Sequence, residues 1–274
     1  MADAFYETLP DLEAYLARIH YTGTRELTRE NLNQLVYDHQ CAVPFENMDC
    51  CQYYRAQAVA LDAPHLFEKV VTNRRGGYCF ELNGLFVLLL RAFGFNAYSC
   101  FCRIARGEAL RPVMHRGCVV LLDGKEYFCD VGFGGPMAPF AVERSEEHQT
   151  FFGETYWITE AENGWRRLMR RRGNGIGDGG ESFDEDASVV IYAPMAFMSQ
   201  DFAAASFQCS GLPTAGFVQR PMVNLRTHDG YLNLADHMFT EVHNGVKESR
   251  ELTDEELPAV LLERFGIQRC EYTV

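Results

Sequence analysis

The chain has 274 residues, with 38 acidic and 25 basic side chains and a formal net charge of −13 at pH 7. This length suggests two or three modules in one compact unit, and the acidic balance argues against nucleic acid as a partner because phosphate binding depends on a basic surface. The longest apolar run, Leu85 to Leu90, is far below the roughly 20 residues that cross a bilayer, so we expect no membrane role.

Helical patterns dominate the first part of the chain. Three helices are predicted, over Asp11 to Ile19, from Thr28 to just before Pro44, and from Cys79 to near Gly94. In the second, Leu32, Leu35, Val36 and His39 lie on one face.

Short β-type runs replace the helices between Phe95 and about Tyr192. The predicted strands are Tyr98 to Ile104, Gly117 to Leu122, Glu126 to Val131 and Thr155 to Thr159. The segment Arg170 to Gly180 has five glycines in eleven residues, and we interpret it as a surface loop with the solvated basic triplet Arg170 to Arg172, which could touch a phosphate.

The last part of the chain mixes strands with a closing helix. Phe217 to Arg226 is predicted as a strand. Thr253 and Glu256 have the spacing of a capping box, so the closing helix is expected to begin there, with Pro258 near the end of its first turn and Gly266 after its end.

The ten cysteines indicate reduced thiols rather than disulfides. They include no C-x-x-C pair, and the N-terminus does not resemble a signal peptide, so a reducing compartment, the cytoplasm, is expected. Cys50-Cys51 and Cys100-x-Cys102 lack histidine partners at zinc spacing, so no metal is expected.

One cysteine stands apart from the other nine. Cys79 follows Gly76 and Gly77 and begins a predicted helix, whose free N–H groups and dipole favour a thiolate. A thiolate is a nucleophile. Cys118 and Cys129 instead lie in apolar strand-like runs, where a thiol behaves as a small hydrophobic group.

A base for this nucleophile can be argued from a predicted hairpin. Asp123-Gly124 joins two strands as a two-residue turn, so Leu122 faces Lys125. Continued along the strands, this register makes His115 and Asp130 diagonal neighbours on one face, within reach of a hydrogen bond. A nucleophile with a paired histidine is shared by cysteine proteases, transglutaminases and several thioester-handling enzymes.

The order Cys, His, Asp and the surrounding motifs resemble the arylamine N-acetyltransferases over nearly the whole chain. The matching stretches are Val43 to Asp49, Arg75 to Asn83, His115 before its strand, Asp130 to Gly135, and Leu262 to Ile267. The resemblance implies that Cys79, His115 and Asp130 are the catalytic triad. The chain departs from the family pattern at Met114, where a threonine is expected before the histidine.

The resemblance also implies an α+β fold with a cysteine-protease-like catalytic core. A helical domain with the nucleophile would span residues 1–94, a small β-barrel with His115 and Asp130 residues 95–192, and a C-terminal α/β lid residues 193–274. The lid would close over the cleft between the other two domains.

The substrate class comes from the resemblance as well. It implies acetyl-CoA as acyl donor and small-molecule arylamines or arylhydrazines as acceptors, as in xenobiotic metabolism, with the acetyl group carried as a cysteine thioester. The implied substrate-binding residues are Phe45, Phe133, Gly134, Gly135 and Met137.

Two other functions stay open. One is a related acyl-cysteine enzyme that closes an amide in biosynthesis, using a carrier-bound acyl chain. The other is a non-catalytic relative that acts as a binding module, against which the intact triad weighs.

Overall fold

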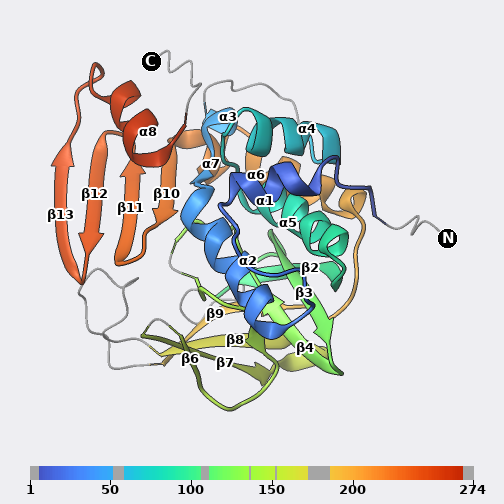
Figure 1. Cartoon of the computed structure of the whole chain (residues 1–274). Helices are drawn as coiled ribbons and strands as arrows, with labels where there is room; N and C mark the ends of the chain where they lie inside the picture. The colour runs from blue at the N-terminus through green and yellow to red at the C-terminus, as the bar shows by residue number, and fades with distance from the viewer. Residues whose placement is uncertain are drawn as a thin grey trace.

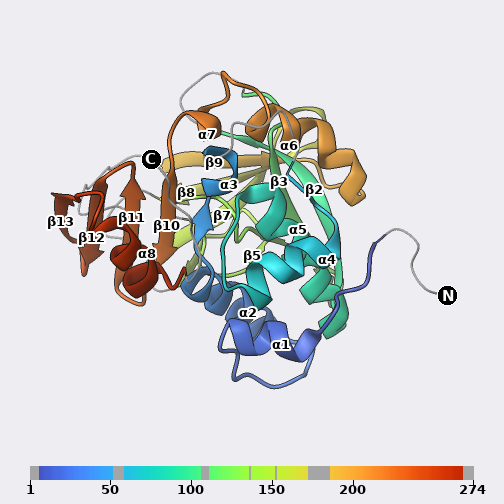
Figure 2. The ribbon, with the colours of Figure 1, turned by 90° about the horizontal axis from the view of Figure 1, so that it is seen from above.

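The computed structural model describes residues 6–51, 59–105, 111–135, 137–151, 153–171 and 186–267, and its architecture is α+β. Helices surround one long helix on one face of an eight-stranded sheet, and a five-stranded sheet lies beside them (Figures 1 and 2). Within the described residues, every helix is too short or too polar to span a bilayer.

The first part of the chain is helical, as predicted. Its helices are α1 (Leu12–Arg18), α2 (Arg29–Ala42), α3 (Met48–Cys51), α4 (Ala63–Phe67), the π-helical turn η1 (Glu68–Thr72) and α5 (Cys79–Phe93). The side chains of Asp11 and Thr28 accept the backbone N–H groups of Ala14 and Asn31, which caps α1 and α2. Gly94, at φ 120°, ends α5.

The eight-stranded sheet is antiparallel throughout, in the order β5-β4-β3-β2-β9-β8-β7-β6. Its strands are β2 (Asn96–Ile104), β3 (His115–Leu122), β4 (Lys125–Cys129), β5 (Val142–Glu143), β6 (Gln149–Phe151), β7 (Glu154–Glu160), β8 (Arg166–Arg171) and β9 (Asp186–Tyr192), with the 3₁₀ turn η2 (Glu162–Gly164). The side chain of Gln149 bonds the N–H and C=O of Glu143 at 2.9 Å each. The two edge strands thus approach each other, and the sheet nearly closes into the expected barrel.

The five-stranded sheet is formed mainly by the end of the chain. Its order is β1 (Phe45–Glu46), β10 (Met222–Arg226), β11 (Gly230–Ala235), β12 (Met238–His243) and β13 (Val246–Glu251). The helices in this part of the chain are η4 (Ser199–Phe202), α6 (Ala203–Ser210), α7 (Gly216–Gln219) and α8 (Leu257–Phe265). Because β1 pairs with β10, the segment before the cysteine helix is joined to this sheet.

Two predictions about the last part of the chain are wrong in detail. Phe217 lies in the short helix α7, and the strand begins only at Met222. The closing helix begins at Leu257 rather than near Thr253, with Pro258 in its first turn, where a missing N–H is tolerated. Half of the expected capping box exists, since the Glu256 carboxylate accepts the Thr253 N–H at 2.9 Å.

Three apolar cores hold these elements together. The largest joins the helices to one face of the barrel sheet, through residues such as Leu85 and Val120. The second fills the barrel around Phe128 and Tyr156, and the third lies between α8 and the five-stranded sheet. The division at residues 94 and 192 stays a prediction, as does the cysteine-protease-like core.

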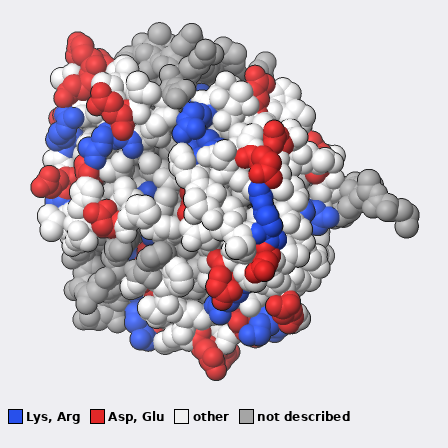
Figure 3. Space-filling view, in the orientation of Figure 1, with Lys and Arg blue, Asp and Glu red and all other residues white. Residues whose placement is uncertain are grey.

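In the basic triplet at the start of the glycine-rich segment, Arg170 is not exposed to solvent as expected. Arg170 and Arg171 belong to β8, and the Arg170 side chain is 11% exposed and lies 3.9 Å from Glu154. The rest of the segment, from Arg172 to Gly180, lies outside the described residues. On the face that Figure 3 shows, basic and acidic side chains are interspersed.

Candidate active site

Cys79 is the first residue of α5, as predicted, and the backbone just before it is closely packed. A Cβ on Gly76 would lie 2.0 Å from the Pro44 carbonyl oxygen, and one on Gly77 would lie 2.8 Å from Glu81 Oε2. Both glycines are needed because the chain passes so near these atoms. The Glu81 carboxylate also accepts the Tyr78 N–H at 3.0 Å, which fixes the residue before the nucleophile.

A cluster of charged side chains supports the loop before Cys79. Arg75 Nη2 lies 2.8 Å from both Glu46 Oε1 and Asp49 Oδ1, and Lys69 Nζ lies 2.7 Å from both Asp49 and Glu81. Lys69 and Arg75 are mostly buried, and Glu46 is fully buried. The cluster holds the loop in place.

The predicted hairpin brings His115 and Asp130 together. Asp123 and Gly124 have φ values of 51° and 75°, as a type I′ turn requires, and Leu122 pairs with Lys125. The ladder ends at the pair Cys118 and Cys129, before the predicted pairs closer to His115. His115 Nε2 nevertheless lies 2.6 Å from Asp130 Oδ2, and both side chains are buried.

Asn83 ties this pair to the nucleophile helix. It lies one turn after Cys79 on α5, and its Nδ2 donates to Asp130 Oδ1 at 2.8 Å and to the Arg116 carbonyl at 2.6 Å. Its Oδ1 accepts the Val131 N–H at 2.9 Å. The Gly132 N–H also donates to Asp130 Oδ1, at 2.9 Å. Asp130 is therefore held by two donors besides His115.

Cys79 and His115 line one cavity of about 670 Å³. Gly132 lies directly over the nucleophile, because a Cβ there would be 2.9 Å from Cys79 Cα. The structure thus brings the three predicted catalytic residues together at the N-terminus of α5. With Nε2 of His115 bonded to Asp130, Nδ1 is the ring nitrogen that is left for a proton from the cavity.

The electrostatics of Cys79 differ from the prediction for a helix N-terminus. Burial raises the pKa of the Cys79 thiol well above its ordinary value, and Cys209 and Asp130 raise it further. The backbone groups of Arg116 and Phe80 lower the pKa, but burial outweighs them. Burial therefore opposes ionisation of the thiol, so a neighbouring base is needed to take its proton.

Three of the five predicted substrate-binding residues line the cavity of Cys79. Phe45, Phe133 and Gly134 do so, and the Phe133 ring meets the His115 ring edge-on at a centroid distance of 5.9 Å. Gly134 has φ +76°, and a Cβ there would lie 2.8 Å from the Phe45 ring. These contacts form an apolar wall beside the thiol.

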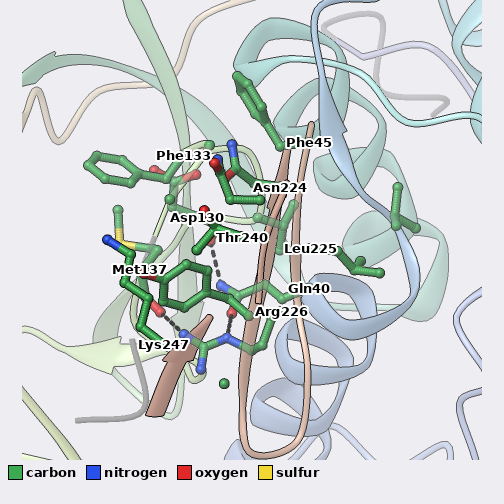
Figure 4. A pocket seen from close by; sticks show the side chains of 17 residues that line it. Gln40, Phe45, Asp130, Phe133, Met137, Asn224, Leu225, Arg226, Thr240 and Lys247 are labelled. Atoms are coloured by element: carbon green, nitrogen blue, oxygen red, sulfur yellow. Dashed lines mark hydrogen bonds between the residues drawn. The ribbon is translucent and has the colours of Figure 1, made fainter. Parts of the chain in front are cut away.

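Gly135 and Met137 lie elsewhere. They line a second cavity of about 330 Å³ (Figure 4). Phe45, Phe133 and Gly134 line both cavities. Its floor is fixed by Arg226, which donates to Gln40 Oε1 at 2.9 Å and to the Met137 carbonyl at 2.6 Å. Gly135 and Met137 are thus not brought to the cysteine.

The later part of the chain supplies one wall of the cavity of Cys79, which the sequence did not predict. Cys209, Leu212, Phe217 and Met222 line the cavity of Cys79, together with Met114 and two arginines, Arg111 and Arg220. No local motif marks these residues, because only the fold places α6 and α7 opposite α5. Among the described residues, no group of three or more His, Cys, Asp or Glu side chains could hold a metal ion.

Comparisons with known proteins agree on one family. A family model described as N-acetyltransferase matches residues 28–271. An arylamine N-acetyltransferase of Escherichia coli (strain K12) is 31% identical over 265 residues, covering 94% of this chain and 89% of that protein.

Solved structures agree with these matches. The arylamine N-acetyltransferase of Salmonella typhimurium has a TM-score of 0.84 at 28% identity, covering 98% of this chain and 96% of its own. The Mycobacterium marinum arylamine N-acetyltransferase in complex with CoA has a TM-score of 0.82 at 28% identity, covering 94% of this chain and 93% of its own.

Proposed function

This chain belongs to the arylamine N-acetyltransferase family, and from that membership we propose that it transfers acetyl groups from acetyl-CoA to arylamines or arylhydrazines through a thioester on Cys79. The observation that carries the proposal is the hydrogen-bonded pair His115 and Asp130 at the cavity that Cys79 lines. Support for the donor is the relative whose structure was solved with CoA.

In the first half-reaction the Cys79 thiol gives its proton to His115 Nδ1. The thiolate attacks the carbonyl carbon of acetyl-CoA, and the C–S bond to CoA breaks as His115 returns the proton to the departing thiolate. Asp130 accepts the hydrogen bond from Nε2–H and stabilises the imidazolium in between. Because burial raises the pKa of the thiol, Cys79 ionises chiefly by this transfer to His115.

In the second half-reaction the amine attacks the acetyl-cysteine and loses a proton to His115. The C–S bond to Cys79 breaks, and the sulfur takes the proton back, which restores the starting state. The N–H of Cys79 stands at the first position of α5, where helix N–H groups lack partners within the helix, so it is the proposed donor to the oxyanion. Phe45 and Phe133 supply the apolar wall for an aromatic acceptor.

The test separates the two half-reactions. Wild type incubated with acetyl-CoA alone should gain one acetyl group in intact-protein mass spectrometry, and Cys79→Ala should gain none. Cys41→Ala, which removes a thiol outside this cavity, should label like wild type. Added arylamine should then remove the label and yield the acetylated amine.

Failure would take one of two forms. If wild type stays unlabelled, the thioester mechanism with acetyl-CoA is wrong. Labelling of wild type by a longer acyl thioester in place of acetyl-CoA would favour the biosynthetic amide synthase instead.

A further inference from the structure

Arg116 follows His115 in β3 and its side chain lies on the opposite face of that strand, beneath the nucleophile helix. It is fully buried, and it ranks among the largest side chains with no exposure to solvent. A buried guanidinium is costly to desolvate and normally has a carboxylate partner.

Arg116 has only neutral partners among the described residues. Its Nε and Nη2 donate to Ser99 Oγ at 3.0 and 2.8 Å, and Nη2 also donates to Ser199 Oγ at 3.4 Å. Nη1 donates to the carbonyl of Phe80 at 3.3 Å, and the Phe202 ring covers the guanidinium at 4.4 Å. Its charge is therefore not cancelled locally.

The nucleophile helix is shaped around this cation. Gly84 lies on α5, and a Cβ there would be 2.6 Å from Arg116 Nη1. Glycine is a poor helix former, so Gly84 lowers the helix propensity of α5. In return it leaves the space that the guanidinium of Arg116 occupies.

Two observations place Arg116 near the nucleophile. The guanidinium bonds the carbonyl of Phe80, the next residue after Cys79, and the backbone of Arg116 is among the groups that lower the pKa of the Cys79 thiol. Burial lowers the pKa of Arg116 to about 10, while Cys118, Tyr6, Cys100 and Cys79 raise it, so the side chain stays cationic at neutral pH. Among the described residues, the titratable or charged side chains that line the cavity of Cys79 or act on its pKa are His115, Asp130, Cys209, Arg111 and Arg220.

We propose that Arg116 is a positioning residue for the transfer reaction, whose buried and unneutralised positive charge beneath the first turn of α5 stabilises negative charge on the sulfur of Cys79. This inference rests on the proposed function for its role in acetyl transfer. Its effect on the thiol is independent of acetyl-CoA and can be measured separately. Burial disfavours the thiolate, and the cation offsets part of that cost.

The test is the pH dependence of alkylation of Cys79 by iodoacetamide, followed on the Cys79 peptide by mass spectrometry. Arg116→Gln should move the midpoint upward by about one pH unit or more, because the charge is lost. Arg116→Lys keeps the charge and should hold the midpoint within about half a unit of wild type. If both variants are folded by circular dichroism and both keep the wild-type midpoint, Arg116 is a packing residue only and the proposal is wrong.

A second pair of variants leaves Arg116 in place, in case Arg116→Gln does not fold. Ser199 is the first residue of η4 and is only half-buried, so an acidic residue is tolerated there. Ser199→Asp should neutralise the guanidinium and raise the midpoint, whereas Ser199→Asn, of equal size, should not. Equal midpoints in these two variants would overturn the proposal.

The alkylation experiment and the acetyl-CoA labelling experiment can fail independently of each other. Alkylation needs no acetyl donor, so the shifted midpoint would stand even if acetyl-CoA failed to label wild type. If the proposed function holds too, Arg116→Gln should slow acetylation of Cys79 at neutral pH at least about tenfold, and raising the pH should recover part of the rate.

Discussion

Asn83 Nδ2 lies 2.8 Å from Asp130 Oδ1, so a side chain of the nucleophile helix holds the carboxylate that bonds His115. The same amide accepts the N–H of Val131 and donates to the carbonyl of Arg116. One fully buried residue thereby links the helix that carries Cys79 to the segments that carry His115 and Asp130.

Asn83→Ala should therefore affect both stability and catalysis. It removes the acceptor of the buried Val131 N–H and one donor each from Asp130 Oδ1 and the Arg116 carbonyl. The free energy of unfolding in urea should therefore fall by about 2 to 4 kcal/mol. Because Asp130 is then held less firmly, kcat for arylamine acetylation should fall at least about tenfold at 25 °C.

Asn31→Ala is the matched control for Asn83→Ala. Asn31 is a buried amide near the start of α2, where Nδ2 donates to Thr24 Oγ1 at 2.7 Å and to the Glu26 carbonyl at 2.9 Å. It should lower stability but leave kcat unchanged. Equal kcat in the two folded variants would contradict a positioning role for Asn83.

Phe133→Ala should separate acceptor binding from acetylation. The Phe133 ring lies in the wall beside His115, so its removal should raise KM for the arylamine, with kcat/KM falling at least about tenfold. Labelling of Cys79 by acetyl-CoA should slow by less than about threefold. Loss of both steps by the same factor would mean that Phe133 is part of the scaffold rather than of the acceptor site.

Gly134→Ala should displace the other wall residue. The new methyl group would lie 2.8 Å from the Phe45 ring, at a backbone φ of +76° that already strains an alanine. Gly153→Ala has a similar φ of +78° with no atom within 4 Å of its Cβ, so it measures the backbone strain alone.

Both glycine variants should lower Tm, and only Gly134→Ala should lower kcat/KM for the arylamine. The measurements are thermal unfolding by circular dichroism and steady-state kinetics with several arylamines. Full activity in Gly134→Ala would show that Phe45 can move without consequence for the acceptor.

Glu81→Gln should change how stability depends on pH. Burial raises the pKa of Glu81 to about 7 from an ordinary 4.5, with Glu46 and Asp49 adding to the effect and Lys69 opposing it. The folded protein then binds more protons than the unfolded chain between these values, so the free energy of unfolding contributed by Glu81 falls as pH rises from about 4.5 to 7.

Urea unfolding at several pH values measures this contribution. Relative to Glu81→Gln, wild type should lose roughly 3 kcal/mol across that interval, and the difference should be constant above it. Parallel stability curves for the two proteins would show that Glu81 is ionised throughout.

Much of the local structure could be predicted because its signals lie close together in the chain. Asp11 and Thr28 cap their helices through N–H groups three residues away, and the two-residue turn at Asp123 and Gly124 fixes the register of its hairpin. The same short-range rules placed Cys79 at a helix start and His115 near Asp130. The start of α8 was misplaced because capping signals at Thr253 compete with Pro258, which fits the first turn of a helix.

Motifs and residue spacing were thus enough to predict the α+β class, most helices and strands, and the pairing of His115 with Asp130. Three features depend on the packing of distant segments: which of them cover Cys79, the place of Gly135 and Met137 in a second cavity, and the burial of Arg116 with only neutral partners among the described residues. The packing also sets the electrostatics of the thiol, since a helix N-terminus lowers the pKa of a cysteine and burial among α5, β3 and α6 raises it. Desolvation depends on everything packed around a group, and the neighbours of Cys79 come from segments more than 100 residues apart, such as Phe45 and Cys209.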